Sequence, residues 1–110
     1  MKYGAEAVPY LIDELRGAGN EKSRDFQLSW FWMLERCGPE AAPAIPELVR
    51  VLSHDYYWYR QLAAQALGAI GPAAREAVPH LEKILENPEE LPRVLAAAWS
   101  ALRKIRQPVK

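Results

Sequence analysis

The sequence predicts an all-α fold in which three helical hairpins, about six helices in all, stack along the chain. A proline-led amphipathic segment occurs three times, and each copy is followed by a second segment with apolar residues at helical spacing. Glycine, asparagine and proline residues, which favour turns, lie between these segments. No segment has the pattern of a convincing strand, so helices packed on helices are the expected architecture.

The repeat is clearest in two segments that begin with Gly-Pro. Gly38 opens GPEAAPAIPELVRVLSHD, Gly71 opens GPAAREAVPHLEKILENP, and the two segments share seven identical residues at an offset of 33. The pattern returns near the N-terminus in AEAVPYLIDEL, where Pro9 precedes Pro46 by 37 residues. We therefore predict one domain, residues 1–110, with units at about 4–37, 38–70 and 71–106 and a C-terminal tail at 107–110.

Each unit should begin with a first helix that a proline interrupts. Gly38 and Gly71 are expected to end the preceding helices, because glycine tolerates the positive φ of a helix C-terminus. Pro39 and Pro72 then open the next unit, where a missing N–H costs nothing. We expect a kink or a restart of the first helix at a further proline in each unit: Pro9, Pro46 and Pro79.

The second helix of each unit carries an apolar stripe that should face the first helix. In the middle unit the stripe begins at Tyr59 and follows the helical spacing i, i+4, i+7, i+8 and i+11. Tyr59 is therefore predicted to be a core residue, and Cys37, the only cysteine, a buried small hydrophobe. The three stripes are Phe26, Trp30, Met33, Leu34 and Cys37; Tyr59, Ala63, Ala66, Leu67 and Ile70; and Val94, Ala98, Ala101, Leu102 and Ile105.

Composition limits the classes of partner. Lys and Arg number 14, as do Asp and Glu, so the formal net charge is zero. This balance argues against nucleic acid as the main partner, because phosphate binding depends on clustered positive charge. No stretch of about 20 apolar residues is available to span a membrane. The first residues also lack the apolar region of a secretory signal, so a cytoplasmic location is the default expectation.

Signatures of catalysis are missing from the sequence. It has no Gly-rich phosphate loop, His-Glu-x-x-His motif, serine elbow or pair of cysteines. His54 and Asp55 could contribute to a metal site, but two ligands within one turn are weak evidence without a third. His80 is expected to be solvated. We therefore predict that the protein is not an enzyme and has no catalytic residue, cofactor or bound metal.

Several charged residues are expected to have structural roles. Arg60 should pair with Asp55 or with a neighbouring carboxylate across the turn. The acidic run of Glu86, Glu89 and Glu90 is expected to be a solvated loop. The last helix ends in basic residues that complement its dipole: Arg103, Lys104, Arg106 and Lys110.

The middle unit resembles a known repeat family. An A-x-P-x-L motif is followed by RQLAAQALGAIG, from Arg60 to Gly71, and both resemble HEAT repeats, in particular the short HEAT-like repeats also found in phycobilin lyases. The resemblance covers about residues 4–106. It implies a right-handed α-solenoid with first helices on the convex side and second helices on the concave side, acting as a binding scaffold. Ankyrin and tetratricopeptide repeats have similar periods, but their signature strings are absent.

The outer units depart from the family pattern. The signature arginine, present as Arg60, is replaced by Gln27 and Leu95 in the flanking units. Phe31 and Trp99 occupy repeat-stacking positions and would lack a neighbour on one side, so they are candidates for self-association or for capping. The family's small alanines are replaced by large aromatic residues in the outer units: Trp30, Phe31 and Trp99.

The second helices, without their core stripes, define the candidate binding surface. Stacking would align Trp32, Gln65 and Ser100 in one row, on a face expected to be uncharged. Such a face favours a peptide, a helix or an apolar ligand over phosphate. In an alternative interpretation, Trp32 and Trp58 fold over a thin core instead of contacting a partner. The candidate partner-binding residues are Leu28, Trp32, Tyr57, Trp58, Gln61, Leu62, Gln65, Ala97 and Ser100.

The leading hypothesis is a non-catalytic scaffold that binds a protein or peptide through the second helices. The alternative is a self-assembling, homo-oligomeric repeat protein or a fragment of a longer HEAT array. A weaker alternative is a bilin-lyase-like or small-ligand-binding protein, in which aromatic residues near 30–32 and 57–59 stack on a planar molecule. HEAT-like DNA glycosylases share the repeat, but they need a longer array and a basic groove.

Overall fold

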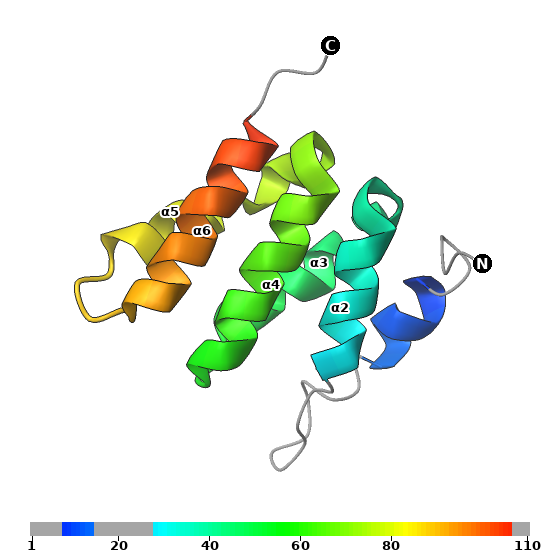
Figure 1. Cartoon of the computed structure of the whole chain (residues 1–110), viewed down its shortest axis with the longest axis horizontal. Coiled ribbons are helices and arrows are strands. Elements are labelled where there is room, and N and C mark those ends of the chain that lie inside the picture. Colours follow the sequence, from blue (N-terminus) through cyan, green and yellow to red (C-terminus); the bar gives the residue numbers. More distant parts are fainter. Residues whose placement is uncertain (1–7, 15–27, 107–110) are drawn as a thin grey trace.

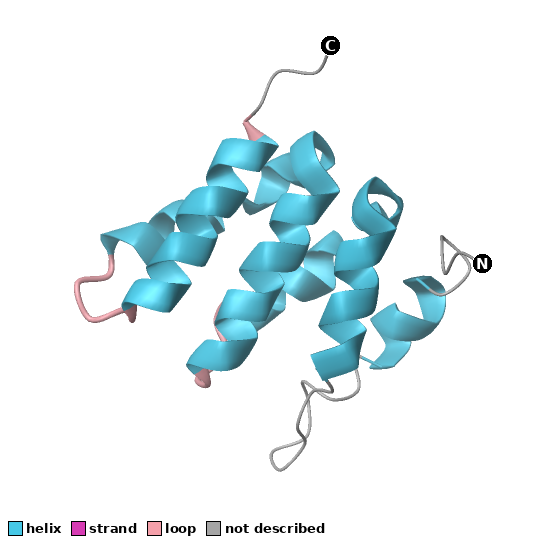
Figure 2. Cartoon of the chain, viewed as in Figure 1, coloured by secondary structure: helices cyan, strands magenta, loops and turns pink. Residues whose placement is uncertain are grey.

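The computed structural model describes residues 8–14 and 28–106 of the chain. All regular elements in these two segments are helices, and no strand occurs among them (Figure 2). The all-α prediction is confirmed. In chain order, the elements are a helical segment at 8–14, α2 (Leu28–Cys37), the 3₁₀ helix η1 (Gly38–Ala44), α3 (Ile45–Val51), α4 (Tyr57–Ile70), the 3₁₀ helix η2 (Gly71–Ala77), α5 (Val78–Glu86) and α6 (Pro92–Ile105).

The helices form two layers. Figure 1 shows α2, α4 and α6 side by side in one layer, with α3 and α5 behind them. The helix α4 packs against both α2 and α6, while α3 packs against α4 and α5 packs against α6. The smallest extent of the molecule is 20 Å, which suits two layers of helices about 10 Å across. The helices α2, α4 and α6 therefore present one continuous surface, called here the second-helix face.

The Gly-Pro junctions form as the sequence predicted. Gly38 and Gly71 have φ values of 61° and 83°, in the left-handed region that glycine tolerates best. Each is followed by a 3₁₀ helix, after which an α-helix restarts with Pro46 or Pro79 in its first turn. A proline there lacks only an N–H that has no partner inside the helix. The corresponding restart ahead of Pro9 falls outside the described residues.

The predicted core stripes are largely confirmed. All five stripe residues of α4 and all five of α6 are buried, including Tyr59 with 6% of its surface exposed. In α2, Trp30 and Leu34 are buried, whereas Met33 and Cys37 are only partly buried, and Phe26 lies outside the described residues. Burial, with a smaller effect of the nearby Glu40 carboxylate, raises the pKa of the Cys37 thiol. Cys37 packs against the core, and its raised pKa disfavours the thiolate.

Candidate binding groove on the second-helix face

A groove of about 470 Å³ runs along the second-helix face between α4 and α6. It is called here the α4–α6 groove. Helix α2 also reaches it, through Glu35, so all three helices of the face contribute. The lining residues are Glu35 from α2, Gln61, Ala64, Gln65 and Gly68 from α4, and Arg93, Ala96, Ala97, Ser100, Ala101 and Lys104 from α6.

Small residues form the floor of the groove and allow its two helices to approach closely. A Cβ atom placed on Gly68 would lie 3.0 Å from the Cα of Ala101 and 3.3 Å from its Cβ. Contacts this short mean that α4 and α6 meet nearly backbone to backbone at this point. Ala64 and Ala97 line the same contact and leave the space above the floor open. The groove is therefore a consequence of missing side-chain volume on both helices.

Trp32, on α2, is 57% exposed and does not itself line the groove. It precedes Glu35 by three residues on α2, so the two side chains share one side of the helix. Gln65 and Ser100, at the same repeat position in α4 and α6, both line the groove. The expectation that Trp32, Gln65 and Ser100 face outward therefore holds, and Trp32 does not cover the core. The side chain of Leu28, another candidate, lies outside the described residues.

Tyr57 and Trp58 lie at the end of the groove where α4 begins and are partly buried against the core. The guanidinium carbon of Arg93 lies 5.5 Å from the ring centroid of Tyr57 and 5.9 Å from that of Trp58. Such cation–π contacts contribute about 0.5–1 kcal/mol each at exposed sites. The two rings are therefore partly occupied by Arg93, and the small-ligand alternative gains no support from them.

Gln61 has an unsatisfied polar atom. It lines the groove, and its Oε1 is buried with no hydrogen-bond partner among the described residues. A buried acceptor left unpaired costs about 1–3 kcal/mol.

The rims of the groove are charged, which corrects the expectation of an uncharged face. Glu35 lies on the α2 side, and Arg93 and Lys104 lie on α6. Lys104 was expected only as part of the basic end of the last helix, and no role was predicted for Glu35 or Arg93. The sequence did indicate their position, because Glu35 follows the stripe residue Leu34 and Arg93 precedes the stripe residue Val94.

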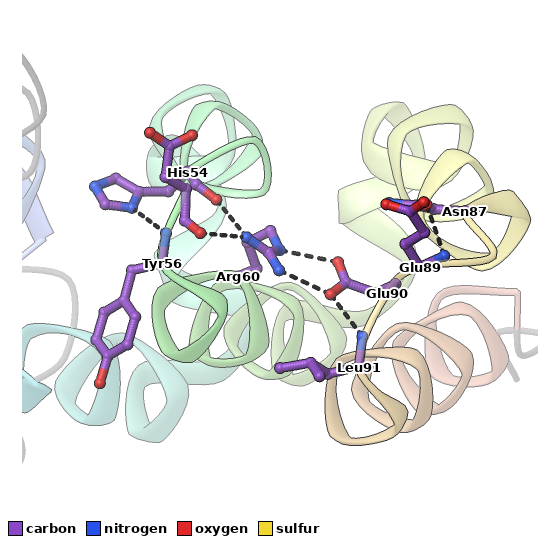
Figure 3. A network of polar contacts seen from close by, with 8 residues as sticks. His54, Tyr56, Arg60, Asn87, Glu89, Glu90 and Leu91 are labelled. Carbon is purple, nitrogen blue, oxygen red and sulfur yellow. Dashed lines mark hydrogen bonds and ion pairs between the residues drawn. The ribbon is translucent and has the colours of Figure 1, made fainter.

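Arg60 has a structural role, as expected, but its carboxylate partner is Glu90 (Figure 3). Its Nε donates to Glu90 Oε2 at 2.9 Å and its Nη2 donates to Glu90 Oε1 at 2.7 Å. Its Nη1 donates to the backbone carbonyls of His54 and Asp55 at 2.7 and 2.8 Å. Arg60 therefore joins the start of α4 to the turn before it and to the loop that leads into α6.

Glu90 is buried, so its assignment to a solvated acidic loop was wrong, although Glu86 and Glu89 are exposed. Burial alone would raise the pKa of the Glu90 carboxyl. Hydrogen bonds from Arg60 and from the backbone N–H of Leu91, with the positive charge of Arg60, outweigh burial and lower this pKa. These partners keep the Glu90 carboxyl ionised. Folding is needed to bring Arg60 to it, because the two residues are 30 positions apart in the sequence.

The two histidines line a second, polar pocket of about 400 Å³ near the Arg60–Glu90 ion pair. His54 Nδ1 accepts a hydrogen bond from the backbone N–H of Tyr56 at 3.0 Å, and His80 is exposed. Within residues 8–14 and 28–106, no three His, Cys, Asp or Glu side chains come together in a way that could hold a metal ion.

The arrangement of paired helices agrees with a comparison of the chain with known families. A sequence model for HEAT repeats matches residues 8–103. The chain belongs to the HEAT-repeat family. Comparisons of this HEAT protein with curated proteins and with solved structures gave no match. Among the described helices, none has the length and apolar character needed to cross a membrane.

The HEAT register explains why Leu62 and Ala97 are buried, at 4% and 8% exposure, although we expected them to face outward. They occupy the same repeat position as Ser29. Ala97 lines the groove from α6 toward α4, so this position faces the preceding second helix. Ser29 is exposed because no second helix precedes α2 among the described residues. The error arose because each second helix packs on its neighbours as well as on its first helix, which widens the buried arc.

The same register corrects the expectation for Phe31. Phe31 is 1% exposed and its ring stacks on Tyr59 of α4 at a centroid distance of 6.2 Å. This repeat position, shared with Ala64 and Trp99, faces the following second helix. Trp99 is 57% exposed because no second helix follows α6 in the described part of the chain. Trp99 therefore remains a candidate for self-association, and Phe31 is a core residue between two units.

Proposed function

We propose that this HEAT-repeat protein is a non-catalytic scaffold that binds a protein or peptide in the α4–α6 groove, with Trp32 as an anchor. In this proposal, three hairpins form a right-handed solenoid whose concave side is the second-helix face. The groove near an exposed indole carries the proposal, because a cleft with a floor of small residues, a charged rim and a large aromatic side chain nearby suits a polypeptide. Tryptophan is also among the residues that most often dominate binding energy.

A peptide library displayed on phage tests this proposal. Peptides are selected on the immobilised protein, and the affinity of the selected peptides is measured by fluorescence anisotropy. Removing the indole in Trp32→Ala should weaken binding by about 2 kcal/mol, or about 30-fold. Trp99→Ala is the matched control, since it removes an equally exposed indole, 57% in each case, from the side of α6 that faces away from α4.

The folding of both variants is measured alongside their peptide affinity. Both variants should keep the helical circular dichroism and the Tm of the parent, because both indoles are largely exposed. Selected peptides that bind Trp32→Ala as tightly as the parent would rule out the groove as the binding surface. The absence of any selectable peptide would rule out peptide binding by this face.

Self-association is a second candidate function, and the exposure of Trp99 at a repeat-stacking position favours it. A second copy could cover this indole as α4 covers Phe31. Sedimentation velocity over a range of concentrations should then show a dimer or larger species that Trp99→Ala converts to monomer. A monomer at every concentration would exclude this function.

A further inference from the structure

The charges around the α4–α6 groove are unequal. Arg93 and Lys104 contribute two positive charges and Glu35 one negative charge. None of these three side chains forms an ion pair with another residue in the described part of the chain. Arg93 and Lys104 are 11 residues apart on α6, which places them about 16 Å apart along the helix axis. A bound segment would therefore meet separate charged groups at the two ends of the groove.

Of the two positive lining residues, Arg93 lies where the helices begin, whereas Lys104 shares its end of the groove with Glu35. The helices α4 and α6 both begin at this end, at Tyr57 and Pro92, and a helix N-terminus carries a positive partial charge (Figure 1). Stacking on Tyr57 and Trp58 orients the guanidinium of Arg93. A guanidinium held in this way still presents N–H groups along its edge, which match the two oxygens of a carboxylate.

The Lys104 end is closer to neutral. The stem of Lys104 lies beside Gly68, with Cδ 3.5 Å from a Cβ placed there. Glu35 corresponds to Gly68 in the repeat register and lines the same groove from α2. The helices also end at this side, and a helix C-terminus carries a negative partial charge. A ligand carboxylate is therefore matched better by Arg93 than by Lys104.

The middle of the groove offers polar side chains to a ligand. Gln61, Gln65 and Ser100 contribute two amides and a hydroxyl, which can donate and accept hydrogen bonds. The backbone of an extended peptide carries unpaired N–H and C=O groups that match such side chains, whereas the backbone of a helix bonds to itself. An extended segment therefore fits this lining better than a helix.

We propose that the α4–α6 groove binds an extended acidic peptide segment, with a carboxylate side chain on Arg93, backbone groups on the polar side chains of the groove and an apolar side chain on Trp32. This inference rests on the proposed function. Adjacent helices lie about 8–10 Å apart, so Arg93 on α6 and Trp32 on α2 are about 20 Å apart across the face. About six residues of extended chain span that distance.

The test compares peptide selections on three proteins. Selection on the parent should enrich Asp or Glu about six residues from a large apolar residue. Selection on Arg93→Glu should lose this enrichment and favour Lys or Arg in its place. Arg103→Glu is the matched control, because Arg103 is an exposed arginine of the same helix that does not line the groove, and its selected peptides should match those of the parent.

Anisotropy with one peptide selected on the parent then measures the contact directly. Arg93→Glu should weaken its binding about 10- to 100-fold, and replacing the peptide's carboxylate by an amide should remove most of that difference. Arg93→Lys keeps the positive charge without the planar edge, so it should keep the acidic preference with an affinity several-fold lower. If Arg93→Glu does not fold, the affinity of Arg93→Lys still shows whether Arg93 contacts the peptide's carboxylate.

Three results distinguish the inference from the proposed function. Selected peptides that depend on Trp32 but show no acidic preference overturn this inference and leave peptide binding intact. An acidic preference that survives in Arg93→Glu and is lost in Arg103→Glu also overturns it, because the outer side of α6 would then be the acidic site. The absence of any binding peptide overturns both.

Discussion

The two junctions between neighbouring second helices are built in opposite ways. At the α2–α4 junction, Phe31 fills the space between the helices and stacks on Tyr59. At the α4–α6 junction, Ala64 occupies the same repeat position, and Gly68 lies against Ala101. The large ring closes the first junction with buried apolar surface, whereas the small residues leave the α4–α6 groove at the second. The residue at a single repeat position thus decides whether a junction is closed, as by Phe31, or left open as a candidate binding site, as by Ala64.

The second junction has a polar connection in place of the aromatic one. The Arg60–Glu90 ion pair links residues 30 positions apart and is mostly removed from solvent, with side-chain exposures of 19% and 3%. The first unit has Gln27 where the middle unit has Arg60. Units joined by an apolar ring and units joined by an ion pair should respond differently to mutation and to pH.

The largest expected effect is at the aromatic junction. Phe31→Ala should lower the free energy of unfolding by about 3–5 kcal/mol, because it removes a fully buried ring and leaves a cavity. Trp99→Ala, at the same repeat position but 57% exposed, should change stability by about 0.5 kcal/mol or less. Urea unfolding followed by circular dichroism measures both. Equal losses of unfolding free energy would mean that Phe31 and Trp99 lie in similar environments.

The ion pair should be the next most sensitive feature. Arg60→Ala leaves a buried carboxylate unpaired and should cost about 3 kcal/mol. Glu90→Gln keeps the side-chain volume and leaves the more exposed Arg60, so it should cost about 1–2 kcal/mol. Glu82→Gln is the control, because the Arg106–Glu82 pair is about half exposed on both sides and should contribute at most about 1 kcal/mol. A larger loss from Glu90→Gln than from Arg60→Ala would contradict this account.

A smaller effect is expected where the groove floor is tightest. In an exposed helix, Gly→Ala raises stability by about 1 kcal/mol. In Gly68→Ala the new Cβ would meet the backbone of Ala101 at 3.0 Å, and a backbone atom cannot rotate away. We therefore expect a net loss of about 1–2 kcal/mol in urea unfolding. An increase in stability would show that α4 and α6 can separate freely at this point.

Acid should affect the second junction and not the first. The pKa of Glu90 is lower in the folded protein than its ordinary value. Its contribution to stability is therefore complete above the ordinary carboxyl pKa, about 4.3, and is lost as the pH falls through the lower, folded value. The stability difference between the parent and Glu90→Gln should shrink below about pH 4 in urea unfolding, while that between the parent and Phe31→Ala should persist.

The sequence predicted the core better than it predicted the surface, for a physical reason. Stripe residues such as Ala63 and Leu102 face the first helix of their own unit, so helical spacing within one segment identifies them. Burial of Leu62, Ala97 and Phe31 depends on contact between units, which spacing within one segment does not report. Comparing equivalent positions of the second helices, at offsets of 33 and 35 residues, could have shown that these side chains face neighbouring helices.

The partner of Arg60 was only partly predictable. An arginine near a turn was expected to find a carboxylate, but Glu90 is 30 residues away and belongs to the loop whose length differs between units. The rim charges were visible in the sequence, yet their importance depends on the groove beneath them. That groove exists because Ala64, Gly68, Ala97 and Ala101 are small on two facing helices at once.

The α4–α6 groove is fixed near both ends, by the Arg60–Glu90 ion pair where the helices begin and by the Gly68–Ala101 contact further along. A cleft held in this way has little conformational freedom to lose when it is occupied. The entropy lost on association would then come mainly from the ligand, at about 0.5–1.5 kcal/mol for each immobilised side chain of a flexible peptide. Cyclised or proline-stiffened versions of a bound peptide should therefore gain affinity without any new contact.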